Sequence, residues 1–281
     1  RTLGPNEYGT FIFLVTSLTV LSSLIDFGST SAFFTFISKK ERGKYFIFIF
    51  FCWKIFQFFL SSLVIFYLLP DKWVNVIWNG ENRILVLLAF ASIFSQFHVW
   101  KTIEKIGESR RLTFRVQSVS TSFTFIQLIT IIALVFLNIL SIQMIFALIV
   151  IEWFIASIIG SILINPKNTK SIEKNTFLNI LLEYKNYCLP LIPYILLSIL
   201  SDFGDTWFLQ NFGGSVEQAY YQVAAQISAI SLLATTSILQ IFWKEIASAN
   251  EKGDIKTLKN LYDTSSKALF LIAALISLIV L

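Results

Sequence analysis

The sequence predicts an all-α membrane protein with about eight transmembrane helices. Hydrophobic residues make up 56% of its 281 residues, charged residues only 14%, and the mean hydropathy is +0.72. A soluble domain carries about 25% charged residues, so this composition excludes an ordinary soluble protein. The chain has 29 Phe but only 5 Pro. The apolar sequence is therefore expected to form long, aromatic-rich helices rather than loops.

Eight segments are long and apolar enough to cross a bilayer, which takes about 20 mostly apolar residues. The connections between these segments are short and polar. The chain begins at Arg1 without a methionine and stops inside an apolar run, so we expect further helices before and after it. The eight segments lie at about 10–37, 45–69, 83–103, 112–138, 141–163, 187–211, 216–241 and 265 to the end.

The basic residues predict how these helices are oriented. Of 22 Lys and Arg residues, 18 fall in four clusters, at 39–44, 101–115, 167–185 and 244–267. Three fall on the opposite side of the membrane, and Lys54 lies within a helix. Cytoplasmic loops are enriched in Lys and Arg, so the four clusters are predicted to be cytoplasmic. Their position between apolar runs indicates membrane topology and gives no reason to expect a nucleic-acid partner.

An internal repeat predicts two lobes. Residues 4–11 and 214–221 align at an offset of 210, with Gly, Glu and an aromatic residue in matching places, and each opens a helix that enters from outside. Parallel repeats of this kind build transporters from two like halves. We expect an N-terminal lobe at 1–165, a cytoplasmic linker at 166–186 and a C-terminal lobe from 187 to 281. Within the linker, 172–186 reads as an amphipathic interfacial helix with Phe177, Leu181 and Tyr184 on one face.

Several motifs in order along the chain resemble bacterial polysaccharide-biosynthesis flippases of the Wzx or O-antigen transporter type. In the first half they are Arg-x-Leu-Gly-Pro-x-Glu-Tyr-Gly-x-Phe at 1–11 and Leu-Ile-Asp-Phe-Gly at 24–28. In the second half they are Tyr187-x-Leu-Pro190, Asp205, Gly213-Gly214, Glu217-Gln-Ala-Tyr220, Val223-Ala224 and Asn-Glu-Lys-Gly-Asp at 250–254. Each motif is loose alone, and the ordered set covers most of the chain.

The resemblance implies a MATE-like fold of the MOP superfamily, with about twelve or more helices in two lobes around a central cavity. This chain would hold helices two to six in the first lobe and seven to nine in the second. The implied function is alternating-access flipping of undecaprenyl-pyrophosphate-linked oligosaccharides from the cytoplasmic to the periplasmic leaflet of the bacterial inner membrane, for O-antigen or capsule synthesis. The implied partners are the lipid-linked oligosaccharide, the bilayer, a polysaccharide polymerase and a chain-length regulator.

Five ionisable residues fall near the middle of the predicted helices, namely Asp26, Lys54, Glu152, Asp202 and, somewhat nearer the outside, Asp205. A charge at the centre of a membrane helix costs roughly 2.5–3.5 kcal/mol on insertion scales, so each needs a partner or a cavity. Asp202 and Asp205 are three residues apart and share a helix face. Two neighbouring carboxylates can hold a proton between them. We therefore treat Asp202, Asp205 and Glu152 as candidates for ion or proton coupling, with structural pairing as the alternative.

Polar residues at spacings of three and four form stripes on three predicted helices. One stripe includes Asp26, a second includes Gln117 and Thr124, and a third includes Gln222. Hydrogen bonding between helices is one interpretation. A shared hydrated lumen is the other, and it makes these four residues substrate-binding candidates.

A pyrophosphate headgroup favours Lys or Arg in the cavity. Lys54 and Arg115 are the candidate phosphate contacts, and Lys54 is the one cation at mid-membrane depth among four carboxylates.

The remaining chemistry-bearing residues predict no catalysis, metal or cofactor. His98, the single histidine, has no second ligand beside it and falls near the predicted cytoplasmic end of its helix, so an interfacial hydrogen bond is expected. Cys52 and Cys188 lie in or beside apolar runs and are expected to be free thiols. There is no P-loop, nucleophile elbow or zinc spacing.

Three alternatives to a glycan flippase remain. A lipid II flippase or a cation-coupled multidrug exporter would share the fold. A membrane glycosyltransferase or polymerase would need a large external loop, whereas the loop at 70–82 carries only Asp71 and Glu81. A non-transporting scaffold would not need buried carboxylates or repeated polar stripes.

Overall fold

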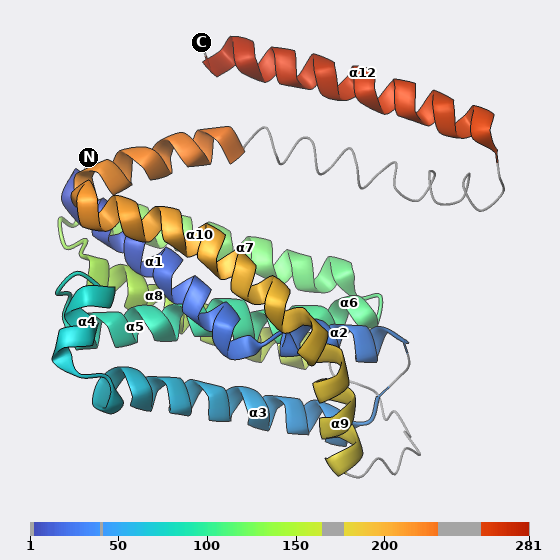
Figure 1. The fold of residues 1–281 in the computed structure, drawn as a ribbon, viewed down its shortest axis with the longest axis horizontal. Coiled ribbons are helices and arrows are strands. Elements are labelled where there is room, and N and C mark those ends of the chain that lie inside the picture. The colour runs from blue at the N-terminus through green and yellow to red at the C-terminus, as the bar shows by residue number, and fades with distance from the viewer. Residues whose placement is uncertain (1–2, 40–41, 165–176, 230–253, 281) are drawn as a thin grey trace. The chain divides into compact units, whose positions relative to one another are not determined.

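The computed structural model describes residues 3–39, 42–164, 177–229 and 254–280, and within these residues it contains helices and turns but no strand (Figure 1). The contacts divide the chain into two units, Arg1–Ala219 and Tyr220–Leu281. Six helical segments in the described ranges are long and apolar enough to cross a membrane. The protein is therefore an all-α, multi-pass membrane protein, as its composition predicts.

The six spans match six of the eight predicted segments. The third extends to Ser109 instead of ending near 103, and the sixth begins at Phe177 instead of 187. Residues 214–229 are helical, and the rest of the predicted segment 216–241 lies outside the described residues. Helix α12 (Ile255–Val280) covers the last predicted segment from 265 to 280. The six spans are Pro5–Asp26, Lys44–Leu68, Arg83–Ser109, Thr113–Phe136, Ile142–Ile164 and Phe177–Phe212.

The first predicted span is broken in its second half into α1 (Pro5–Asp26) and α2 (Ser29–Lys39). Phe27 (φ 46°) and Gly28 (φ 76°) both adopt left-handed backbone conformations. That conformation costs little at glycine but roughly 1–2 kcal/mol at a residue with a side chain. The break is therefore a strained feature that the surrounding structure must stabilise, and it coincides with the Asp-Phe-Gly sequence.

The second span joins α3 (Lys44–Leu63) to a π-helical turn, η1 (Val64–Leu68). Arg83 stabilises its C-terminal end, because the guanidinium donates to the carbonyl oxygens of Ile65 (3.0 Å), Phe66 (2.9 Å) and Leu69 (2.6 Å). It also pairs with Asp71, the first residue of the short helix α4 (Asp71–Ile77), at 2.7 Å. A cation over the last carbonyls of a helix satisfies acceptors that have no partner within the helix.

The third span is one rod made of α5 (Arg83–Phe94), a π-helical turn η2 (Ser95–Trp100) and α6 (Lys101–Ser109). It packs against α8 (Ile142–Ile164), and α7 (Thr113–Phe136) packs against both α6 and α8. The third span is the most buried of the six, and α7 is among the most exposed. The third span therefore forms the centre of the first unit.

The sixth span continues from α9 (Phe177–Cys188) through the 3-10 turn η3 (Leu189–Leu191) into α10 (Ile192–Phe212). Helix α10 runs beside α1, and α9 packs against α2 (Figure 1). Tyr184 of α9 contacts the ring of Phe36 (centroids 5.2 Å apart), and Arg42 pairs with Glu183. From Phe177 onward, the linker predicted at 166–186 is therefore helical and packs against α2. The lobe boundary stays a prediction, because 165–176 lie outside the described residues.

The buried apolar residues form two clusters. One contains Phe33, Phe50, Trp100 and Trp153, and the other contains Phe13, Leu18, Phe90 and Phe94. Buried polar side chains, among them Lys54 and His98, lie where the two clusters meet. The Lys54 ammonium is 5.1 Å from the ring centroid of Phe50 in the first cluster, and the His98 ring is 4.7 Å from the ring of Phe94 in the second.

Gly9 of α1 lies against the first turn of the helix at 214–229. A Cβ atom on Gly9 would collide with the backbone carbonyl of Ser215. Next to it, the hydroxyls of Thr10 and Ser215 are 3.4 Å apart, and Gln210 donates to Ser215 at 2.9 Å. Gly9, within the first copy of the repeat, therefore has a packing role.

We expect Gly9→Ala to lower the thermal unfolding temperature of the purified protein in detergent. Alanine gains roughly 1 kcal/mol in helix propensity. A clash with backbone, which cannot rotate away, should cost more than this, since overpacking costs about 1–3 kcal/mol even where side chains can move. Gly4→Ala is the matched control, because no atom lies within 4 Å of a Cβ there. Equal unfolding temperatures for the two variants would contradict the packing role.

Candidate functional site

The helix break between α1 and α2 is held by the side chain of Asp26. Its carboxylate accepts hydrogen bonds from the Ser29 hydroxyl (2.7 Å), the Thr30 hydroxyl (2.8 Å) and the Thr30 backbone N–H (3.1 Å). These donors belong to the first turn of α2, so Asp26 closes α1 and caps α2 at the same time. A side-chain acceptor in this position satisfies a backbone donor that has no partner within the helix.

Lys54 of α3 neutralises this carboxylate. Its ammonium group forms an ion pair with Asp26 and donates to the Ser29 hydroxyl at 3.2 Å. Lys54 is 2% exposed and Asp26 is 8% exposed. Two opposite charges with this much burial are stable only when paired and further hydrogen-bonded, and here both conditions are met. The pair ties α3 to the break in the neighbouring span.

His98 completes the cluster from η2. Its Nδ1 lies 3.4 Å from the Lys54 ammonium and 4.0 Å from the Asp26 carboxylate. An ammonium group has no acceptor, so Nδ1 is the acceptor in this contact. The ring is 6% exposed, which corrects the expectation of an interfacial histidine. The expectation was wrong because the span reaches Ser109, so that residue 98 lies near its middle. His98 also belongs to a π-helical turn, and such turns often occur at functional positions.

Gln57, one helical turn beyond Lys54, supports the same break. Its amide donates to the Ile25 carbonyl at 2.7 Å, one of the acceptors released where α1 ends. The other amide atom, Oε1, is buried and has no hydrogen-bond partner among the described residues. Sequence patterning did not single out Gln57, Ser29 or Thr30 in this role. The sequence feature that could have indicated Gln57 is its spacing of three residues from Lys54, which places both side chains on one face of α3.

The cluster borders a cavity of about 660 Å³, whose lining includes Asp26, Ser29, Cys52, Tyr184 and Cys188. Both thiols are free, as predicted. Among the described residues no three His, Cys, Asp or Glu side chains are grouped as a metal site would require. The cluster is thus a charge-neutral, hydrogen-bonded group beside an open cavity. It can fix the geometry of the break and present polar atoms to a bound molecule.

Of the predicted substrate contacts, the structure brings Asp26 and Lys54 together but places Arg115 elsewhere. Arg115 is exposed at the start of α7, beside a cavity of about 400 Å³ between α7 and α8. This cavity and the one beside Asp26 share no lining residue. The two candidate phosphate contacts therefore do not form one cationic site in this structure. Lys54 already has a carboxylate partner.

The polar stripe on α7 is exposed, whereas the stripe through Asp26 is buried. Gln117 donates to Glu104 at 3.0 Å, and the hydroxyl of Thr124 donates to the Ser120 carbonyl at 3.0 Å. Gln222 is half-buried in the helix at 214–229, within the second unit. A single lumen lined by all three stripes stays a prediction.

The candidates for ion coupling are spread over two helices. Glu152 of α8 is 8% exposed, and its Oε2 has no hydrogen-bond partner among the described residues. Asp202 and Asp205 both lie in α10, as their spacing predicts, and Asp205 is exposed. The side chain of Asp202 lies outside the described residues, so a shared proton between the two carboxylates stays a prediction.

We expect the Asp26–Lys54 pair to be strongly coupled in stability. Removing one partner of a buried pair leaves an uncompensated charge and costs roughly 3–5 kcal/mol. Asp26→Asn and Lys54→Met should each lower the unfolding temperature markedly. The double variant, which removes both charges, should be more stable than either single variant. The measurement is a double-mutant cycle on purified protein.

The exposed pair of Arg83 and Asp71 is the control for this cycle. The side chain of Asp71 is 88% exposed. Exposed ion pairs contribute about 0–1 kcal/mol, so Asp71→Asn should change the unfolding temperature little. If the effects of Asp26→Asn and Lys54→Met simply add in the double variant, the two residues do not stabilise the fold as a pair.

Comparison with protein-family models, with curated proteins and with solved structures gave no match to this chain.

Proposed function

We propose that this protein is a transporter that flips an undecaprenyl-pyrophosphate-linked oligosaccharide across the bacterial inner membrane for surface polysaccharide synthesis. In this proposal the fold is MATE-like, with two lobes that rock between inward-open and outward-open states. The protein performs no covalent chemistry. Its partners are the lipid-linked glycan, the surrounding bilayer, and the polymerase and chain-length regulator that act after flipping.

The observation that carries the proposal is the buried Asp26–Lys54 pair at the broken helix, beside a large cavity. Charges inside membrane spans normally mark substrate or ion pathways. The break lies in Leu24-Ile25-Asp26-Phe27-Gly28, one of the motifs that carry the resemblance to flippases. A helix interrupted at a pair of left-handed residues can bend there, which a rocking transporter requires.

The distribution of charge suggests how the cluster would take part. Lys54 has one carboxylate partner, Asp26, which lines a cavity wide enough to admit another anion. An anionic headgroup that competes with Asp26 for Lys54 would loosen the cap on α2 and free the break. Binding and bending would then be coupled through one ammonium group. A lipid II flippase would use the same cluster in the same way, and only the glycan would differ.

The deciding experiment is deletion of the gene. A flippase mutant should accumulate a complete lipid-linked repeat unit on the cytoplasmic face, measured by lipid extraction and by its inaccessibility to external glycan-modifying reagents. Loss of the repeat unit itself would identify a transferase instead. Complementation with Lys54→Glu should leave export lost, because two facing carboxylates cannot hold the break. Full export by that variant would contradict the role of Lys54.

Proton coupling has its own test. If Asp202 and Asp205 hold a proton between them, Asp202→Asn combined with Asp205→Asn should abolish transport driven by a proton gradient in vesicles. Asp263→Asn in α12 is the control for removing a carboxylate from a described helix. Unchanged gradient-driven transport by the double variant would exclude these two residues as the coupling site.

A further inference from the structure

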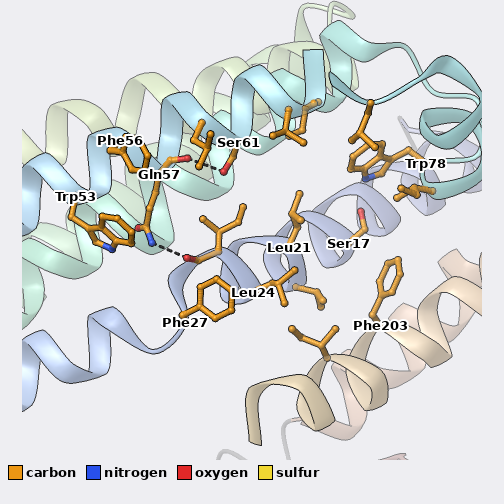
Figure 2. A pocket seen from close by; sticks show the side chains of 18 residues that line it. Ser17, Leu21, Leu24, Phe27, Trp53, Phe56, Gln57, Ser61, Trp78 and Phe203 are labelled. Atoms are coloured by element: carbon orange, nitrogen blue, oxygen red, sulfur yellow. Dashed lines mark hydrogen bonds between the residues drawn. The ribbon is translucent and has the colours of Figure 1, made fainter. Parts of the chain in front are cut away.

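Two cavities of the first unit lie end to end along α3. The outer one, of about 550 Å³, lies between α1, η1 and α10, and the inner one, of about 660 Å³, lies between α3 and α9. Both are lined by Phe27, Trp53 and Phe56, so they meet at these three rings. Figure 2 shows Phe27 close to Trp53 at one end of the outer cavity, Trp78 at the other end, and Phe203 facing it from α10. We call the two cavities together the α3 groove.

The α3 groove is as long as the apolar part of a bilayer. Its lining follows one face of the second span from Tyr45 to Ile65. Twenty residues of helix rise about 30 Å, which equals the thickness of the hydrocarbon core. A site of this length is more than a pocket for a headgroup or a small molecule. It matches a ligand that extends across the membrane.

The wall is mostly apolar along its length and carries a cation at one end. Aromatic and aliphatic side chains line most of it. The polar exceptions are Ser17, Gln57 and Ser61 in the outer half and Asp26 and Ser29 in the inner half. Lys185 lines the inner half, within the cluster of basic residues predicted to be cytoplasmic. An apolar channel that ends at an ammonium group suits an amphipath with a long hydrocarbon chain and an anionic head.

The dimensions distinguish between possible chains. A phospholipid acyl chain reaches only across one leaflet, about 15 Å, and would fill half of the groove. A single flexible chain longer than one leaflet fits the length of the groove.

We propose that the α3 groove binds the chain of a polyisoprenoid phosphate, with its phosphate beside Lys185 and its chain crossing the rings of Phe27, Trp53 and Phe56. The choice of a polyisoprenoid rests on the proposed function, whereas the existence of a groove for a long chain does not. The chain would run beside the Asp26 cluster, so that the lipid and the helix break share one wall.

The two cysteines of the chain report on this site, because Cys52 and Cys188 both line the inner half of the groove. The experiment treats full-length protein in detergent with a fluorescent maleimide and measures labelling of each cysteine by peptide mass spectrometry. Undecaprenyl phosphate should slow the labelling of both thiols. Farnesyl phosphate has the same head and a shorter chain, and it should require an at least about tenfold higher concentration for equal protection. Dioleoyl phosphatidic acid tests an ordinary acyl lipid.

Two leucines of α3 provide matched variants. Leu60 lines the outer half and is 47% exposed, whereas Leu63, three residues further on, lines neither cavity and is 48% exposed. Leu60→Trp should raise the undecaprenyl phosphate concentration needed for protection by about tenfold or more, and leave farnesyl phosphate unaffected. Leu63→Trp should change neither. Lys185→Gln should weaken protection by both phosphates.

Three outcomes would overturn the proposal. Equal protection by phosphatidic acid would indicate a groove for ordinary lipids. Thiols that are unreactive under all conditions would indicate that another protein segment covers the groove. Identical effects of the two tryptophan variants would place the chain elsewhere. If any of these outcomes occurs while gene deletion still traps a lipid-linked unit on the cytoplasmic face, only the groove assignment fails. If undecaprenyl phosphate protects the thiols but gene deletion traps no such unit, the groove assignment stands and the proposed function fails.

Discussion

The first unit depends on one ion pair placed where a membrane helix stops and starts again. Asp26 terminates α1, caps α2 and binds Lys54 of the neighbouring span, so a single carboxylate connects three helical segments. Hydrocarbon offers no water to satisfy the backbone groups that a break exposes, and side chains must do it instead. That carboxylate, together with Gln57, offsets the strain of the left-handed residue Phe27.

The ion pair also organises the packing around it. His98 and Gln57 approach from separate helices, and each side of the cluster abuts one of the two apolar cores. A purely apolar interior of Phe and Ile could accept many alternative arrangements, since lipid and protein are equally apolar. Directional hydrogen bonds to one carboxylate select among them. Specificity is thus concentrated in a few polar atoms, and the many aromatic residues supply the contact area.

Sequence alone predicted the spans well and the site in part. Long apolar runs interrupted by polar turns locate spans such as 112–138 and 141–163, because bilayer thickness fixes their length. The cost of a buried charge pointed to Asp26 and Lys54, but 28 residues separate them and no local rule pairs them. His98 was misplaced because the length of its span was underestimated. Arg115 was placed with Lys54 because both are basic, whereas in the structure Lys54 is buried against Asp26 and Arg115 is exposed on α7.

The π-helical turn at Ser95–Trp100 has a consequence for how this region tolerates change. Such a turn carries one residue more than a regular helical turn, and each residue of a helix advances the side-chain direction by about 100°. Loss of a single residue there would leave a regular helical turn, so that Thr102 and Ile103 of α6 would keep facing the core. Loss of a residue within α5 or α6 would instead rotate the rest of the helix by about 100° and move such side chains out of the core. The stretch between Phe94 and Lys101 is therefore the part of this span in which a change of length by one residue does least harm to the packing.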